Sequence, residues 1–168
     1  MPLNQIKIYN QHLDLLGLNP HQRTISLKNI FDRDFTNKQP VIFNSKNVVP
    51  CPLDGAIEMK TLFAHLTTTI VDKKTNSRDF DFQRSKRLHW VRYHIDGKKS
   101  TNMLVFTVKE PNGLRTYLYD DEEKYVIVFE PRIKNNIYFL LTAYHLEGKD
   151  AQRDKIKKKY ARRIQEPF

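Results

Sequence analysis

The clearest hydrophobic pattern lies in the second half of the chain, where four apolar stretches follow one another. They are NMLVFTV (102–108), LRTYLY (114–119), KYVIVFE (124–130) and IYFLLTAYHL (137–146). Each is rich in β-branched and aromatic residues, and the links between them are short and contain turn-forming residues. Since links this short join antiparallel neighbours, the pattern predicts a four-stranded antiparallel meander.

A helix is predicted directly before these strands, over residues 82–96, with Asp81 as its N-cap and Gly97 at its end. Its apolar row must pack on one face of the sheet, which gives an α+β fold. Both sides of the last two strands are apolar, so a second cover is needed, and we expect the N-terminal half to supply it. The positions expected in the core are Leu88, Val91, Ile95, Phe106, Val126, Val128, Phe139 and Leu141.

The first half has a weaker pattern of helices and strands. We predict helices over 6–18 and 54–66, the second capped by Asp54, and strands in TISL (24–27), PVIF (40–43) and TTTIVD (67–72). A basic helix over about 149–163 closes the chain. We divide the chain into 1–80, a mixed helix and strand segment without an assigned role, and 81–168, a domain with the helix and the sheet.

Composition fits one globular unit, with 39% apolar and 29% charged residues in 168. No apolar run reaches the roughly 18 residues that span a bilayer, and the N-terminus lacks the apolar segment of a signal peptide, so we expect a cytoplasmic protein without membrane contact. The single cysteine, Cys51, excludes an internal disulfide and a cysteine-based zinc site. We therefore expect neither a metal nor another cofactor.

Charge indicates the class of partner. The net charge is +10, and residues 149–164 alone hold eight Lys or Arg against two Asp. A polyanion such as RNA fits this surface, because cationic side chains release the counterions that phosphates condense. The alternative is a basic surface that serves only solubility. On this basis the expected RNA-binding residues are Arg87, Arg92, Lys157, Lys158, Lys159, Arg162 and Arg163.

Alternation along the strands places several polar side chains together. Arg115, Tyr117 and Tyr119 point to one side of their strand, and Tyr138, Thr142 and Tyr144 to one side of theirs. If the two sets share a face, the sheet presents an arginine, a threonine and tyrosines in one place. Alternatively, the tyrosines are cross-strand pairs with Arg115 at an exposed edge.

On the predicted helix, His89 lies near Ser85, Arg92 and Tyr93 and beside the buried row. Histidine transfers protons near neutral pH, so His89 is the candidate acid or base, although a half-buried histidine with a structural hydrogen bond has the same pattern. His12, His21 and His65 receive no role. Glu130 is expected to pair with Arg132 at a strand end.

These elements, in order, resemble a known family. FDFQRSKRLHWVRYHI, LRTYLYDDEEKYVIVFEPR and IYFLLTAYHLEGKDAQRDKIKKKYARR are similar to phage and prophage-associated nuclease domains grouped with barnase, EndoU, colicin and RelE-like ribonucleases. The resemblance covers roughly residues 80–164. It implies a small ribonuclease fold, often a toxin, and an immunity protein or antitoxin as a possible partner. The matching positions are Arg87, His89, Arg115, Tyr117, Thr142 and Tyr144.

The residues and the resemblance together predict a metal-independent endoribonuclease, in which the RNA 2′-hydroxyl attacks phosphorus and leaves a 2′,3′-cyclic phosphate. His89 is then the acid or base, Arg115 the phosphate clamp, and Tyr117, Thr142 and Tyr144 orient the phosphate or stack a base. Two alternatives remain open on the same fold: a nucleic-acid-binding module without catalysis, and an inhibitor of a host protein.

Overall fold

The computed structural model describes residues 2–52, 59–165 and 168 and is built around a six-stranded sheet, in the order β1-β2-β8-β7-β6-β5. The strands are β1 (Val41–Phe43), β2 (Lys46–Pro50), β5 (Met103–Glu110), β6 (Gly113–Asp120), β7 (Tyr125–Arg132) and β8 (Ile137–His145). β2 runs parallel to β8, and every other pair of neighbours is antiparallel. The α+β class is confirmed. The sheet has six strands rather than four because the β1–β2 hairpin of the first half joins it.

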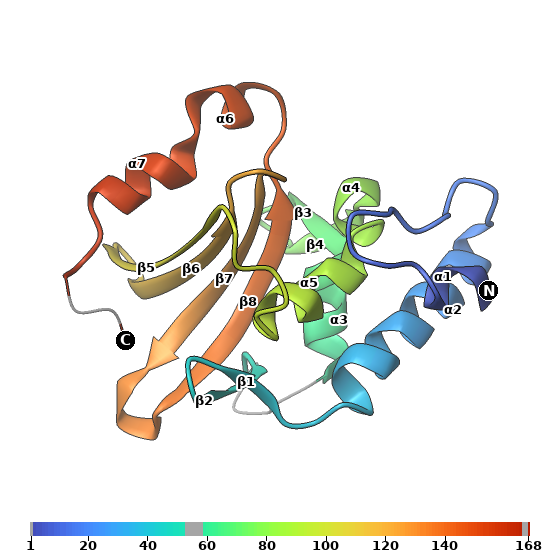
Figure 1. The fold of residues 1–168 in the computed structure, drawn as a ribbon. Coiled ribbons are helices and arrows are strands. Elements are labelled where there is room, and N and C mark those ends of the chain that lie inside the picture. The colour runs from blue at the N-terminus through green and yellow to red at the C-terminus, as the bar shows by residue number, and fades with distance from the viewer. Residues whose placement is uncertain (1, 53–58, 166–167) are drawn as a thin grey trace.

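Helices lie on both sides of this sheet (Figure 1). The helices are α1 (Pro2–Gln5), α2 (Pro20–Phe31), α3 (Met59–Thr67), α4 (Phe82–Ser85), α5 (Leu88–Ile95), α6 (Gly148–Arg153) and α7 (Lys155–Ala161), with a π-helical turn at Asp32–Thr36 and a 3-10 turn at Ile133–Asn135. A separate two-stranded hairpin is formed by β3 (Thr68–Asp72) and β4 (Ser77–Phe80). In Figure 1, α1 to α5 lie on one side of the sheet, and α6 and α7 on the other.

Two hydrophobic cores fill these two sides. The first joins α2, α3 and α5 to the sheet and includes Phe31, Leu66, Trp90 and Phe129. The second is smaller and packs Ile156 of α7 against strand residues such as Phe106. The expectation that the N-terminal half covers the second face was wrong. That half joins α5 on the first face, and the C-terminal helix covers the second one.

The helix predicted over 82–96 is interrupted. Asp81 caps α4 as expected, with its carboxylate accepting from Arg84 N at 2.9 Å, and Gly97 follows α5 with a positive φ of 69°. Between α4 and α5 the chain turns at residues 86 and 87, so the side chains of the two helices do not form one continuous face. The expected core is confirmed at Leu88, Val91, Ile95, Phe106, Val126 and Val128, whereas Phe139 and Leu141 are only half-buried.

The predictions for the rest of the chain were partly wrong and partly confirmed. Residues 6–18 form turns instead of a helix, and Ile6 and Leu16 are 73% and 87% exposed. TISL lies inside α2, because Asn19 caps that helix and Pro20 begins it. PVIF and TTTIVD are strands, as predicted. The helix predicted over 54–66 is α3, and Asp54 lies outside the described residues. The C-terminal helix is divided at Asp154, whose φ is 41°.

Candidate functional site

One face of the sheet carries the polar row that alternation predicted. Thr142 pairs with Val128, which pairs with Tyr117, so these side chains cross three neighbouring strands on one face. Tyr144 lies two residues along the same side of β8, opposite Val126. The register shifts between Val128 and Phe129, where Leu141 is the extra residue of a β-bulge. The structure therefore brings Arg115, Tyr117, Thr142 and Tyr144 to one face.

The same bulge corrects the prediction for Tyr138. Strict alternation places Tyr138 beside Thr142, but the extra residue reverses the side on which the following residues lie. Tyr138 consequently packs in the first core, against Phe43 and Phe129, on the opposite face. Tyr119 remains on the face of Tyr117 and is fully buried in the second core.

Arg115 and Tyr117 both have acidic partners on that face. Arg115 Nη1 lies 3.3 Å from Glu130 Oε2, and Glu130 also pairs with Arg132 at 2.8 Å, as predicted. Tyr117 donates to Glu110 at 3.2 Å, and burial, followed by Glu110, raises the pKa of its phenol. Arg115 is therefore neutralised by a carboxylate, which weakens it as a phosphate clamp.

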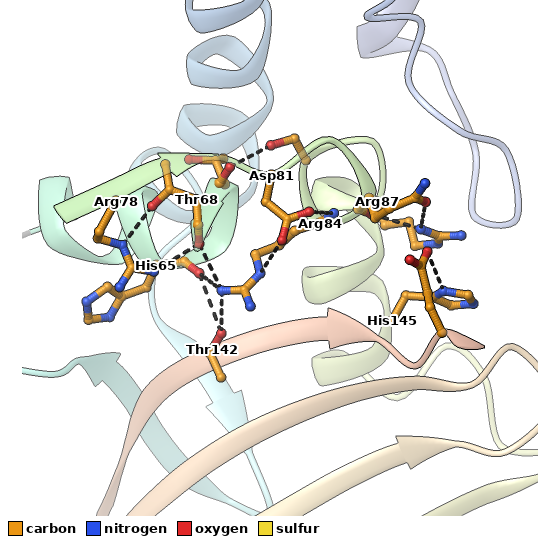
Figure 2. Close-up of polar contacts among 12 residues, drawn as sticks. His65, Thr68, Arg78, Asp81, Arg84, Arg87, Thr142 and His145 are labelled. Atoms are coloured by element: carbon orange, nitrogen blue, oxygen red, sulfur yellow. Dashed lines mark hydrogen bonds and ion pairs between the residues drawn. The ribbon is translucent and has the colours of Figure 1, made fainter. Parts of the chain in front are cut away.

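An arginine that the sequence did not single out reaches Thr142. Arg84 Nη1 donates to Thr142 Oγ1 at 3.1 Å, and also to the carbonyl oxygens of His65 and Thr68 at 2.9 and 3.0 Å. These contacts join α4, the end of α3 and β8 at one point (Figure 2). The Arg84 guanidinium also lies 6.0 Å from the centre of the Tyr144 ring. Two of these contacts are to β8, at Thr142 and Tyr144, and the other two are to main-chain carbonyls of α3 and β3.

A pocket of about 350 Å³ opens at this point. It is lined by His65, Thr69, Ile70, Arg78, Arg84, Leu141 and Thr142. Two of these residues are arginines, one is a histidine, and none is acidic. The strand β8 has no strand neighbour on this side beyond Leu140 among the described residues, so the pocket lies along an unpaired part of its edge. Such a pocket favours an anion.

Arg84 has an acidic partner that lies outside the pocket lining. Asp81 Oδ2 forms an ion pair with the guanidinium at 3.8 Å from Nε, and Arg84 Nε is buried without a hydrogen-bond partner in the described part of the chain. Burial lowers the pKa of Arg84, and burial followed by the charge of Arg84 lowers the pKa of Arg78. Burial is the largest cause of both shifts, and a bound anion would act in the opposite direction.

His65 is the titratable group of this pocket. Burial, and then the charge of Arg78, lower its pKa below the ordinary value of 6.5, although the Leu141 backbone opposes this shift. The imidazole is therefore neutral at pH 7 and can accept a proton. In Figure 2 the ring lies beside Arg78, on the same side of β8 as Arg84 and Thr142.

A second basic group continues along the edge of β8. Arg87 is 5% exposed, donates to Gln83, and has a buried Nε without a hydrogen-bond partner among the described residues. His145 lies below it in Figure 2 and pairs with Glu147 at 3.3 Å. Burial and the charge of Arg87 lower the pKa of His145. Arg87 therefore lies near the pocket, but its side chain is buried and not part of the exposed basic surface.

The predicted catalytic histidine lies elsewhere. His89 is on α5, which packs on the opposite face of the sheet, and it is 5% exposed. Its Nε2–H donates to the Ile8 carbonyl at 3.1 Å, and burial lowers its pKa to about 4. Arg92, a predicted RNA contact, is buried and bound to Asp96 and to the carbonyl oxygens of Asp34 and Lys38. The structure does not bring either residue to the pocket.

The basic residues of α7 and the turn after it have mixed surroundings. Lys157 pairs with Asp121 at 2.9 Å, and Lys159 forms an ion pair with Glu110. Arg163 lies over the ring of Tyr160, 4.0 Å from its centre. Lys158, Arg162 and Arg163 have no acidic partner within 4 Å in the part of the chain that the structure describes. Of the predicted helix contacts, these three are the ones available to RNA.

A buried polar cluster on the other side of the sheet holds the N-terminal segment. Asp120 is fully buried and accepts from Tyr9 at 2.6 Å, from Lys99 at 2.7 Å and from His94 at 2.9 Å. Burial alone would raise its pKa, but the hydrogen bonds from His94, Lys99 and Tyr9 outweigh it and hold the pKa far below its ordinary range. Both ring nitrogens of His94 are in use, since Nδ1 contacts the Trp90 carbonyl oxygen. The cluster is structural.

The described residues contain no group of side chains suited to a metal ion. Within residues 2–52, 59–165 and 168, no three His, Cys, Asp or Glu side chains are grouped so that they could hold a metal ion. No helix in the same ranges is long and apolar enough to cross a membrane. Comparisons with protein-family models, with curated protein sequences and with solved structures found no match.

Proposed function

We propose that this protein is a metal-independent endoribonuclease whose active site is the pocket at Arg84, His65 and Thr142, on the edge of β8. The observation that carries the proposal is the lining of that pocket, which combines two arginines and a neutral histidine and, among the described residues, contains no carboxylate. The resemblance of residues 80–164 to phage-associated ribonucleases supports it, because Thr142 and Tyr144 are among the matching positions. His89 has no part in this site.

The chemistry needs a base, an acid and positive charge around phosphorus. We assign the base to His65, whose neutral ring takes the proton of the RNA 2′-hydroxyl. The bond from O2′ to phosphorus forms while the bond from phosphorus to O5′ breaks. Arg84 and Arg78 stabilise the charge on the phosphoryl oxygens through the guanidinium N–H groups that do not bind the chain itself. The products are a 2′,3′-cyclic phosphate and a 5′-hydroxyl end.

Tyr144 is the proposed acid for the leaving O5′. Burial raises the pKa of its phenol, so the proton is present at neutral pH, and the ring lies beside Arg84. The phenol gives its proton to O5′ and regains one from water. Thr142 has a positioning role, because its hydroxyl accepts from the guanidinium that would contact the phosphate.

A binding module without catalysis is the second candidate function. It is favoured by cations outside the pocket, because Lys158, Arg162 and Arg163 are exposed and have no acidic partner among the described residues. Exposed cations of this kind suit the phosphate backbone of a single strand. In that case the Arg84 site would bind one phosphate of an intact RNA.

The test is incubation of the purified protein with single-stranded RNA in EDTA, followed by analysis of the product ends. The proposal predicts cleavage with 2′,3′-cyclic phosphate ends, and no cleavage where the 2′-hydroxyl at a mapped site is replaced by hydrogen. Cleavage of that deoxy substrate at the same bond would overturn the 2′-hydroxyl mechanism. Tight binding with no cleavage of any tested RNA would leave the binding module as the better account.

A further inference from the structure

A larger pocket adjoins the proposed active site. Its volume is about 560 Å³, and it is lined by Lys60, Thr61, Ala64, His65, Ile70, Asn76 and Arg78. Three of these residues, His65, Ile70 and Arg78, also line the pocket that contains Arg84 and Thr142. The two pockets therefore share a wall, and a ligand bound by Arg84 can extend into the second one.

The lining of this second pocket differs from that of the first. Ile70 and Ala64 provide apolar surface, and Ile70 is 46% exposed. The imidazole of His65 and the guanidinium of Arg78 are flat groups on which an aromatic ring can stack. None of the seven lining residues is acidic.

Arg78 is fixed at the junction of the two pockets. Its Nε donates to Thr68 Oγ1 at 2.8 Å and its Nη2 to the Thr68 carbonyl at 2.9 Å, so the plane of the guanidinium is held by its own hairpin. Asn76 lies in the turn of that hairpin with a positive φ of 54°. Its side-chain amide provides a donor and an acceptor, as the edge of a base requires.

We propose that this pocket binds a nucleobase of the RNA whose phosphate is held by Arg84. This inference rests on the proposed function, and it adds that single-stranded RNA is the substrate, because a base can enter the pocket only when it is unpaired. The base packs on Ile70 and stacks on the flat groups of His65 and Arg78. Asn76 hydrogen bonds to its edge.

The experiment measures the affinity for a single-stranded hexanucleotide with 2′-fluoro groups, which lacks the nucleophile of the proposed reaction. The same oligomer is made with an abasic residue at each position in turn. Base stacking contributes about 1–3 kcal/mol, so one abasic position should weaken binding by roughly 10-fold, and the others by less. Ile70→Ser should weaken binding of the intact oligomer by a similar factor. In this variant, the abasic residue at the sensitive position should cause no further loss of affinity.

Two matched controls accompany the variants. Val71→Ser changes the next residue of the same hairpin, which is 56% exposed and lines neither pocket. Asn76→Gly removes the amide but keeps the positive φ, and Asn136→Gly makes the same change at another turn residue, whose φ is 55°. We expect Asn76→Gly to weaken binding and both control variants to leave it unchanged.

The outcomes separate the two proposals. If Arg84→Gln weakens binding while Ile70→Ser and Asn76→Gly do not, the phosphate site stands and the base pocket is wrong. If Ile70→Ser weakens binding while Arg84→Gln does not, the pocket binds RNA and the proposed active site is wrong. If the wild-type protein does not bind the hexanucleotide, both proposals fail. An equal loss at every abasic position would also contradict a single base pocket.

Discussion

Arg84 donates a hydrogen bond to Thr142 at 3.1 Å, although the two residues are 58 positions apart. The contact fixes the short helix α4 to the strand β8, in the part of β8 beyond Leu140 that does not pair with β2. Since the same guanidinium binds two main-chain carbonyls, one side chain both closes the fold and supplies charge to a pocket. This double role distinguishes it from the exposed arginines.

The first prediction concerns these two residues. Arg84→Gln should lower RNA cleavage by about 10²- to 10³-fold, the usual cost of removing one group that stabilises transition-state charge. Thr142→Val removes only the hydroxyl that positions the guanidinium, so we expect a loss of roughly 5-fold, from one hydrogen bond of about 1 kcal/mol. Single-turnover rates measure both effects.

Arg23→Gln is the matched control, because it removes the same charge from α2 at a residue that lines neither pocket. We expect its cleavage rate to equal that of the wild type. Thermal unfolding of each variant separates loss of chemistry from loss of fold. If Arg84→Gln is folded and cleaves as fast as the wild type, Arg84 is a structural residue only.

The sequence predicted the fold better than it predicted the lining of the proposed active site. Four consecutive strands and the buried row of Leu88, Val91 and Ile95 follow from local periodicity. Residues two apart share a face unless a bulge intervenes, so Arg115, Tyr117, Thr142 and Tyr144 were grouped correctly, whereas Tyr138 was not. The bulge at Leu141 could not be predicted from the sequence. Apolar side chains are acceptable on both faces of this strand, so the pattern of apolar residues does not reveal an extra residue.

Arg84 and His65 could not be found by the same means. The prediction of one continuous helix over 82–96 singled out His89, because it lies beside the apolar row of that helix. The structure has a turn between α4 and α5, so this helix is not continuous. His65 comes from α3, in the half whose pattern was weak, and it meets β8 only through tertiary packing. One local signal was available: Arg84 is the third residue after the cap Asp81, where the helix begins.

The second prediction concerns His89 and the pH dependence of stability. Its pKa is about 4 in the folded chain and about 6.5 when unfolded, so the unfolded state binds more protons between these values. The stabilising contribution is complete above pH 6.5 and is lost as the pH falls toward 4, with a total of about 3 kcal/mol. Urea unfolding from pH 7.5 to 4.5 measures it.

His89→Gln should remove this part of the pH dependence, because glutamine does not titrate in this range. Its amide can still donate to the Ile8 carbonyl. If the wild type and His89→Gln lose stability equally between pH 6.5 and 4.5, the buried neutral state of His89 is contradicted.

The third prediction concerns Asp120, which holds Tyr9, His94 and Lys99 together. Asp120→Asn leaves Lys99 without its buried counter-charge, and we expect a loss of about 3–5 kcal/mol in the free energy of unfolding. The neighbour Asp121 pairs with Lys124 and Lys157 near the surface, so Asp121→Asn should cost less than about 1 kcal/mol. Equal losses for the two variants would contradict the central position of Asp120.

The fourth prediction concerns the basic residues of α7 and the turn after it. Replacing Lys158, Arg162 and Arg163 by Gln removes three cations that have no acidic partner among the described residues. The slope of log affinity against log salt for single-stranded RNA should fall by about 2, at about 0.7 for each phosphate contact. Lys159→Gln breaks a pair with Glu110 and should change the slope less. An unchanged slope in the triple variant would show that RNA does not reach α7.

The most direct test of the proposed active site compares two histidines under identical conditions. His65→Ala and His89→Ala are assayed for single-turnover cleavage of one RNA in EDTA at pH 7, with RNA affinity measured separately. We predict that His65→Ala lowers cleavage by about 10²- to 10⁴-fold with little change in affinity, as expected for the loss of a general base, while folded His89→Ala cleaves at the wild-type rate. If His65→Ala cleaves at the wild-type rate and folded His89→Ala does not cleave, this location of the active site is contradicted.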